Sequence, residues 1–379
     1  MIDDKIKAAM AEATRLTQAG RFAEATALIQ RVLGARPHDE DALRKPPVAE
    51  PDIIEGDFER VDDAEASELG GVRHGAGPLG PSGPPGVRPS PGISRGSFRD
   101  AAGARDYRLY MPRQLADPAA LLVMLHGCGQ NPDTFADLTR MDALAEQWGF
   151  AVLYPAQSPV ANASGCWCWY DPDNQVRGAG EPGILAGMTG RIRDGCRLDA
   201  RQVYVAGFSA GGTMAATLAA TYPELFAGVG VHSGLPYGIA GDMVSALTLM
   251  AQGPGGGEVS PPDQRLPPII VFHGDGDATV SPANSEALIR QFLPGASVGL
   301  DRVRLDGRSD QGVGYSRIQY KRLDGALLAE HWLAQGLGHG WLGGRASAPF
   351  AEPRGPDASR EMLGFFWSLS GRSVPEGAV

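Results

Sequence analysis

The 379-residue chain lacks the features that mark membrane proteins and nucleic-acid-binding proteins. It has no apolar run long enough to cross a bilayer, and its first ten residues lack the continuous apolar segment of a signal peptide. It has no basic tract, and its formal net charge is -10, which argues against a phosphate-backbone partner. These absences predict a globular, cytoplasmic protein without a membrane span.

Cysteine is also scarce. The four cysteines are Cys128, Cys166, Cys168 and Cys196, and they would allow three pairings in an oxidising compartment. In a cytosolic protein they are expected to be free thiols. The Cys-x-Cys spacing is not the usual spacing of zinc ligands, so we expect no metal site, and nothing in the sequence requires an organic cofactor.

Composition divides the chain into three parts. Residues 1–35 carry apolar residues at helical spacing around a turn, which predicts a helical hairpin similar to one tetratricopeptide-type unit. Such a pair cannot bury its own apolar face, so we expect it to dock on the main domain or self-associate rather than bind a specific partner. Residues 36–97 are acidic and then rich in proline and glycine, which predicts a disordered linker. The main domain is expected over residues 98–379.

The main domain alternates buried strands with helices. Apolar runs at 120–125, 150–154, 226–231 and 269–272 are typical of central parallel strands, and 134–148 is typical of a helix. This alternation predicts an α/β fold with a mostly parallel central sheet, in which ligands bind at the carboxyl ends of the strands.

The stretch from Val203 to Gly212 contains the candidate nucleophile. An apolar run breaks into Gly-Phe-Ser-Ala-Gly, with Ser209 at its centre, and continues as a small-residue helix. A sharp turn from strand to helix needs glycines near the serine and exposes the serine oxygen above the sheet. The amide of Ala210 would then lie in the first helical turn, where N–H groups have no intrahelical partner and can bind an oxyanion.

A candidate acid and a candidate base follow the serine. Asp277 lies after the strand at 269–272 and before a helix start, and Asp275 is the alternative. His339 lies in a glycine-rich loop that can carry an imidazole into a crowded site, and His331 is the weaker alternative. The order serine, aspartate, histidine is that of the α/β-hydrolase fold.

Two further groups of residues lie near the expected site. The loop from His126 to Gln130 offers a second oxyanion donor, the amide of Cys128, whereas His126 itself is expected to be structural. The aromatic side chains Trp167, Trp169, Tyr170 and Trp341 could line an acyl or polymer groove, with a packed cover over the sheet as the alternative. In the same segment, Arg177 and Glu181 are expected to form a structural pair.

Together these motifs resemble the polyhydroxybutyrate depolymerase esterase family. The resemblance covers roughly residues 100 to 370 and rests on His126-Gly-Cys-Gly-Gln, Cys166-Trp-Cys-Trp-Tyr, Gly207-Phe-Ser-Ala-Gly-Gly and Gly338-His-Gly-Trp-Leu-Gly-Gly. It implies hydrolysis of short-chain polyhydroxyalkanoate esters, with Ser209, Asp277 and His339 as the triad. The family is often secreted and carries a polymer-binding module, whereas this chain shows no evident signal peptide and carries a helical hairpin. Were the protein secreted, the resemblance would make Cys128 and Cys166 the expected disulfide.

Two other functions remain open at this point. Relatives of the family include feruloyl and acetylxylan esterases, so a carbohydrate esterase is the first alternative. The second is an adaptor associated with polymer granules through residues 1–35, with the hydrolase fold as a scaffold. Activity on a soluble ester after deletion of residues 1–97 would favour the enzyme.

Overall fold

The computed structural model describes residues 90–254, 265–293 and 299–372. The hairpin predicted over residues 1–35 and nearly all of the predicted linker lie outside these described residues. No helix within the described ranges is long and apolar enough to span a bilayer.

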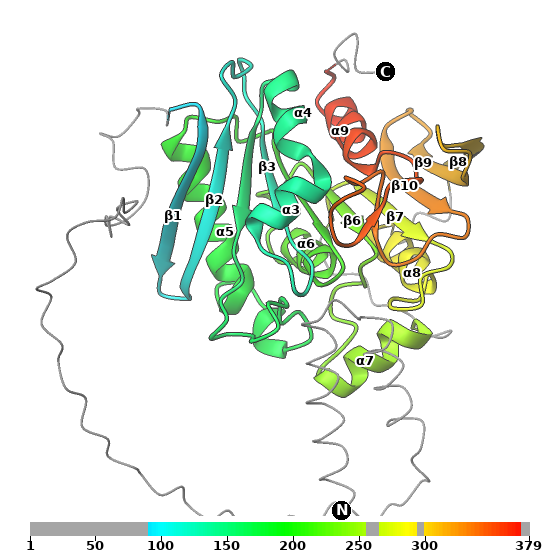
Figure 1. The fold of residues 1–379 in the computed structure, drawn as a ribbon, viewed down its shortest axis with the longest axis horizontal. Coiled ribbons are helices and arrows are strands. Elements are labelled where there is room, and N and C mark those ends of the chain that lie inside the picture. Colours follow the sequence, from blue (N-terminus) through cyan, green and yellow to red (C-terminus); the bar gives the residue numbers. More distant parts are fainter. Residues whose placement is uncertain (1–89, 255–264, 294–298, 373–379) are drawn as a thin grey trace, which may run out of the picture.

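A ten-stranded sheet runs through the centre of the molecule (Figure 1). The strands follow the order β1-β2-β4-β3-β5-β6-β7-β10-β9-β8. From β4 to β10 every neighbouring pair is parallel, while the two strands at each end of the sheet are antiparallel. The mostly parallel sheet predicted from the sequence is therefore confirmed. The strands are β1 (Gly92–Asp100), β2 (Gly103–Met111), β3 (Leu121–Leu125), β4 (Ala151–Pro155), β5 (Val203–Phe208), β6 (Gly228–His232), β7 (Ile269–Gly274), β8 (Leu300–Arg308), β9 (Gly314–Arg322) and β10 (Leu327–Ala334).

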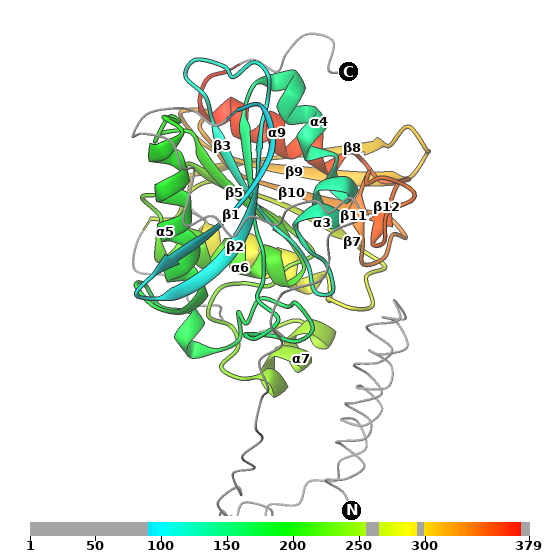
Figure 2. The same cartoon turned by 60° about the vertical axis from the view of Figure 1, so that its left-hand side comes forward.

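Helices cover both faces of the sheet (Figure 2). One face packs against α3 (Pro132–Thr139), α4 (Met141–Trp148) and α9 (Ala358–Leu369). The other packs against α5 (Gly180–Gly195), α6 (Ala210–Thr221) and α8 (Ala283–Phe292). Central strands such as β3 are buried on both faces, which explains their continuous apolar sequence. The remaining elements are η1 (Pro172–Asn174), α7 (Met243–Gln252) and a small parallel pair, β11 (Trp341–Leu342) and β12 (Ala351–Glu352).

The structure corrects two of the predicted elements and adds a strand that the sequence did not predict. Strand β1 begins at Gly92, so the boundary predicted between linker and domain falls inside an edge strand. The helix predicted over 134–148 is two helices, because Arg140 between them adopts a left-handed conformation with φ 54°. Strand β10 was not predicted, although it pairs with β7 in the parallel part of the sheet and leads directly into the loop that carries His339.

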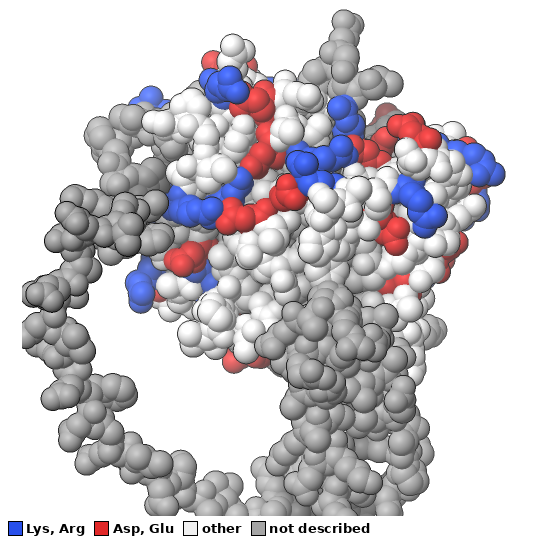
Figure 3. Space-filling view, viewed as in Figure 1, with Lys and Arg blue, Asp and Glu red and all other residues white. Residues whose placement is uncertain are grey.

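Charged side chains are intermixed on the surface shown in Figure 3. Positive and negative groups alternate over this face of the described residues, and they form no extended positive area there.

Candidate active site

Ser209 lies at a strained turn between β5 and α6. Its backbone has φ 55° and ψ -120°, a conformation that residues other than glycine rarely adopt and that costs about 1–3 kcal/mol. Its N–H donates to the carbonyl of His232 at 2.8 Å, which fixes the turn to strand β6. A Cβ at Gly207 would overlap the carbonyl of Gly211, and a Cβ at Gly211 would overlap that of Leu125. Only glycine therefore fits at these two positions of the turn.

Asp277 and His339 form a hydrogen-bonded pair at the carboxyl ends of β7 and β10. Oδ2 of Asp277 lies 2.7 Å from Nδ1 of His339. Oδ1 of Asp277 accepts the N–H groups of Thr279 and Val280, each at 2.9 Å. The carboxylate is an acceptor, so the proton of His339 lies on Nδ1 and its Nε2 retains a lone pair. This tautomer is the one that a general base needs.

Electrostatics keep Asp277 ionised. Burial alone would raise its pKa, but the neighbouring His339 and the hydrogen bond from His273 outweigh burial and hold the pKa well below its usual range. Nε2 of His273 lies 3.3 Å from Oδ2 of Asp277 and 2.9 Å from the carbonyl of Val280. These interactions therefore favour the ionised form of Asp277.

The alternative acid and base are engaged elsewhere. Oδ1 of Asp275 accepts the N–H of Gly336 at 2.5 Å, which ties two loops together. Nε2 of His331 lies 2.8 Å from Oγ of Ser285, and burial lowers the pKa of His331 to about 4. His126 is buried and its Nε2 accepts a backbone N–H at 3.2 Å, as expected of a structural histidine.

The loop that carries His339, here called the base loop, lies beside the turn that carries Ser209. The rings of His339 and Phe208 are 4.9 Å apart, and Phe208 directly precedes Ser209. The structure thus brings the predicted acid and base to the side of the predicted nucleophile.

The two predicted oxyanion donors belong to segments in close contact. Gly211, in the first turn of α6, packs so closely on the end of β3 that a Cβ there would touch the carbonyls of both Leu125 and His126. The amides of Ala210 and Cys128 come from these two segments, and within the described chain neither amide has a hydrogen-bond partner.

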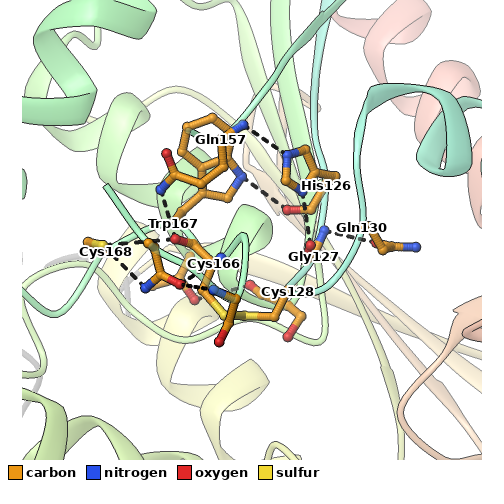
Figure 4. The surroundings of a disulfide bond; sticks show 12 residues. His126, Gly127, Cys128, Gln130, Gln157, Cys166, Trp167 and Cys168 are labelled. Carbon is orange, nitrogen blue, oxygen red and sulfur yellow. Dashed lines mark hydrogen bonds between the residues drawn. A yellow bond between two sulfur atoms is a disulfide. The ribbon is translucent and has the colours of Figure 1, made fainter. Parts of the chain in front are cut away.

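A disulfide between Cys128 and Cys166 braces the loop after β3 (Figure 4). The expectation of free thiols is wrong for these two residues, and the pairing implied by the family resemblance is confirmed. Further hydrogen bonds hold the same loop: Nε1 of Trp167 donates to the carbonyl of His126 at 3.0 Å, and Gly129 N–H donates to the carbonyl of Ser164 at 2.9 Å. The loop is therefore fixed from several directions.

The structure does not support the aromatic groove. Trp167 and Trp341 have no exposed surface and Trp169 is 5% exposed, so these three side chains are core residues. The indole N–H of Trp341 finds a partner in Oγ of Ser359 at 3.0 Å, which permits its burial. Of the four predicted aromatic residues, only Tyr170 is partly exposed.

The buried carboxylate of Glu181 supports the same region, but through partners other than the predicted one. Glu181 is 3% exposed and accepts hydrogen bonds from the side chains of Arg105 and Gln157 and from the backbone N–H of Cys168. The predicted pair with Arg177 is therefore wrong, because Arg177 binds Glu224 instead.

Comparison with known proteins agrees with this geometry. The chain is 34% identical over 241 residues to poly(3-hydroxyalkanoate) depolymerase C of Paucimonas lemoignei, a match that covers 61% of this chain and 57% of the relative. It is 31% identical over 247 residues to feruloyl esterase B of Neurospora crassa, covering 61% of this chain and 81% of the relative. It is 28% identical over 256 residues to acetylxylan esterase A of Emericella nidulans, a match that covers 62% of this chain and 79% of the relative.

The fold is also shared with a solved structure. An acetyl xylan esterase from Aspergillus awamori superposes with a TM-score of 0.53 at 24% identity, covering 65% of this chain and 94% of the other. Residues 105–304, more than half of the chain, match the family model described as Esterase PHB depolymerase. The chain therefore belongs to this family of carboxylic ester hydrolases.

Proposed function

We propose that the chain is a serine esterase that hydrolyses the ester bonds of short-chain polyhydroxyalkanoates, such as polyhydroxybutyrate or its oligomers, through an acyl-enzyme. The observation that carries this proposal is the strained turn at Ser209 beside the hydrogen-bonded pair of Asp277 and His339. The chain order of these three residues is that of α/β-hydrolases.

In the proposed mechanism, Oγ of Ser209 attacks the ester carbonyl while Nε2 of His339 accepts the serine proton. Asp277 holds the imidazole in the required tautomer and stabilises the imidazolium that forms. The amides of Cys128 and Ala210 bind the negative charge of the tetrahedral intermediate, and the loss of one such donor costs about 3 kcal/mol in the transition state. His339 then protonates the leaving alkoxide, and the acyl group remains on Ser209.

Deacylation repeats these steps with water as the nucleophile. His339 takes a proton from water, the hydroxide attacks the acyl-enzyme, and Ser209 leaves with the proton from the imidazolium. Removal of either Ser209 or His339 should abolish turnover and leave substrate binding largely intact.

Similarity favours a polyester substrate. The relative named as a poly(3-hydroxyalkanoate) depolymerase has 34% identity, against 31% and 28% for the relatives named as feruloyl and acetylxylan esterases. The chain spans little more than half of the depolymerase, and these identities are close. A feruloyl or acetylxylan esterase therefore remains the second candidate, because the same triad serves any ester.

Rates on three substrates test the proposal. Hydroxybutyrate oligomers, methyl ferulate and p-nitrophenyl butyrate would be compared, with Ser209→Ala as the blank. We expect the oligomers to have the highest kcat/KM and the Ser209→Ala protein to be inactive on all three. Preference for methyl ferulate would contradict the polyester assignment but keep the mechanism, while an active Ser209→Ala protein would contradict the mechanism itself.

The disulfide bears on the location of the protein. A Cys128–Cys166 bond is stable in an oxidising compartment, so it supports the extracellular alternative over the cytoplasmic location that the sequence predicted from its lack of an evident signal peptide. For residues 1–35 we propose self-association or contact with polymer granules. Deletion of residues 1–89, which leaves strand β1 intact, should leave hydrolysis of p-nitrophenyl butyrate unchanged if this hairpin serves contact and not catalysis. Loss of that activity in the shortened protein would indicate that the deleted segment supports the catalytic domain.

A further inference from the structure

His232 makes contact with the turn that carries Ser209 and with the segment that follows His339. It is the last residue of β6, and its side chain has no exposed surface. Its carbonyl accepts the N–H of Ser209 at 2.8 Å, so its main chain holds the nucleophile's turn. Its Nε2 accepts the N–H of Leu342 at 3.0 Å, so its side chain holds the segment that follows His339.

Both nitrogens of this imidazole are engaged in one tautomer. Because Nε2 accepts an N–H, it carries a lone pair, and the proton of the neutral ring lies on Nδ1. Nδ1 then donates to Oγ of Ser233 at 3.1 Å. Complete burial, reinforced by the nearby His273 and His339, holds the pKa of His232 well below its ordinary value. The ring therefore stays neutral and keeps its acceptor toward Leu342.

Stacking fixes the position of the same ring. The imidazole is stacked on the indole of Trp341, with ring centres 5.0 Å apart and planes inclined by 23°. On another side it is stacked on Phe272, the residue paired with it in strand β7, at 5.9 Å. Trp341 lies two residues after His339, so the ring of His232 locates the end of the base loop by both packing and a hydrogen bond.

The pairing of β11 with β12 holds one side of the same segment, through bonds from the N–H of Trp341 to the carbonyl of Phe350 at 2.7 Å and from the N–H of Gly343 to that of Glu352 at 2.9 Å. His232 supplies the bond to the amide between them, that of Leu342. His339 is flanked by glycines, which supply no side chains for packing. The N–H of Leu342 has no other partner within the described residues. Without the imidazole acceptor this buried amide would lie unpaired, and the loop would shift to recover a hydrogen bond.

We propose that His232 is a positioning residue that sets the separation between Ser209 and His339, through its carbonyl on one side and its Nε2 on the other. This inference rests on the proposed function of Ser209 and His339. His232 does not itself meet the substrate or exchange a proton with it. Its effect is on the geometry of proton transfer, in which a displacement of about 1 Å can cost a hundredfold in rate.

Two amide variants separate this role from simple packing. The side-chain oxygen of His232→Gln is as many bonds from Cα as Nε2 is, so it can accept the N–H of Leu342. The amide of His232→Asn reaches only as far as Nδ1 and cannot. His331→Asn is the matched control, because His331 of β10 is also a buried histidine bonded through Nε2, in its case to Ser285 of α8.

Steady-state hydrolysis of p-nitrophenyl butyrate, normalised to the serine that reacts with a fluorophosphonate, gives the readout. His232→Asn should lower kcat by about 10- to 100-fold and leave KM within about twofold, because positioning acts on the reaction and not on binding. His232→Gln should recover most of the rate, and His331→Asn should keep kcat within about twofold of the wild type. Equal rates for the Asn and Gln variants, whether both fast or both slow, would overturn the inference.

A measurement on the wild-type chain serves if His232→Asn does not fold. Nitrogen-15 NMR of the histidines should show His232 with its proton on Nδ1 and a lone pair on Nε2 at pH 7. A proton on Nε2 would overturn the inference. An inactive wild-type chain would overturn the proposed function and this inference together, whereas an active wild type beside a fully active Asn variant would overturn only the inference.

Discussion

Removal of the Cys128–Cys166 disulfide should lower both the stability and the rate, by amounts that follow from its position. The bond closes a loop with a sequence separation of 38. The chain-entropy relation for a loop of this length gives about 4 kcal/mol of stabilisation at 25 °C, through restriction of the unfolded chain. We therefore expect the Cys128→Ser/Cys166→Ser protein to lose about 4 kcal/mol of unfolding free energy.

Removal of the disulfide should lower kcat by less than the complete loss of one oxyanion donor would. Complete loss of one donor lowers kcat by about 100- to 1000-fold. The hydrogen bonds from Trp167 to the carbonyl of His126 and from Gly129 to Ser164 remain after the disulfide is removed. The Cys128 position would then be held less tightly but in the same place, so we expect kcat to fall by about tenfold.

Urea unfolding followed by circular dichroism, with kcat on p-nitrophenyl butyrate, measures both effects. Cys168→Ser is the matched control, because Cys168 remains a thiol in the same segment. A stability loss below about 1 kcal/mol would refute the loop-closure argument. An unchanged kcat would refute the assignment of the Cys128 amide to the oxyanion site.

Three other predictions follow from the site and its surroundings. Asp277→Asn should lower kcat by about 10⁴-fold, because His339 would lose the required tautomer. Asp275→Asn should keep most of the rate, because its amide oxygen can still accept the N–H of Gly336. Comparable losses of kcat in the two variants would contradict the choice of Asp277 as the acid. Gly211→Ala should destabilise the fold by more than about 3 kcal/mol because its Cβ overlaps backbone atoms, whereas Gly190→Ala, in α5 with open space around it, should stabilise it by about 0.5–1 kcal/mol in thermal or urea unfolding. Burial lowers the pKa of His331 to about 4 from 6.5, so between these pH values the unfolded chain binds more protons than the folded chain. The free energy of unfolding should therefore fall by about 3 kcal/mol as the pH drops from 6.5 to 4. His331→Gln should make urea unfolding less dependent on pH in that window.

The parts of the site that could be predicted from the sequence are those with a strict local requirement. A sharp turn from strand to helix tolerates only small residues around the serine, so Gly207 and Gly211 mark Ser209 in the sequence itself. The acid was harder to choose, because Asp275 and Asp277 both follow β7. Only the fold shows that one of them bonds to Gly336 and the other to His339.

Strand β10 escaped prediction because its polar residues are satisfied by distant partners. Glu330 is 1% exposed, and its carboxylate binds Arg317 of the neighbouring strand. His331 is buried against Ser285 of α8. A sequence shows a glutamate and a histidine as polar interruptions, because the partners that allow their burial lie 13 residues away for Glu330 and 46 residues away for His331.

The tryptophans were misplaced for a similar reason. Their polar neighbours suggested exposure, but the N–H of Trp167 meets the carbonyl of His126 and that of Trp341 meets Ser359, so both rings are fully buried.

The position of His232 carried a usable signal, since a buried apolar run ends in this histidine as others end near the site. Its role depends on a contact with Leu342, 110 residues away, which no local pattern reveals.

The most direct test of the account is to trap the acyl-enzyme. Wild-type protein mixed with p-nitrophenyl butyrate and quenched in acid within one turnover would be digested and its peptides analysed by mass spectrometry. The account predicts a butyryl group on Ser209, with a burst of p-nitrophenol of one equivalent per site, and neither in the Ser209→Ala protein. A butyryl group on another residue, or steady hydrolysis without a burst or a label under conditions where deacylation is slow, would contradict it.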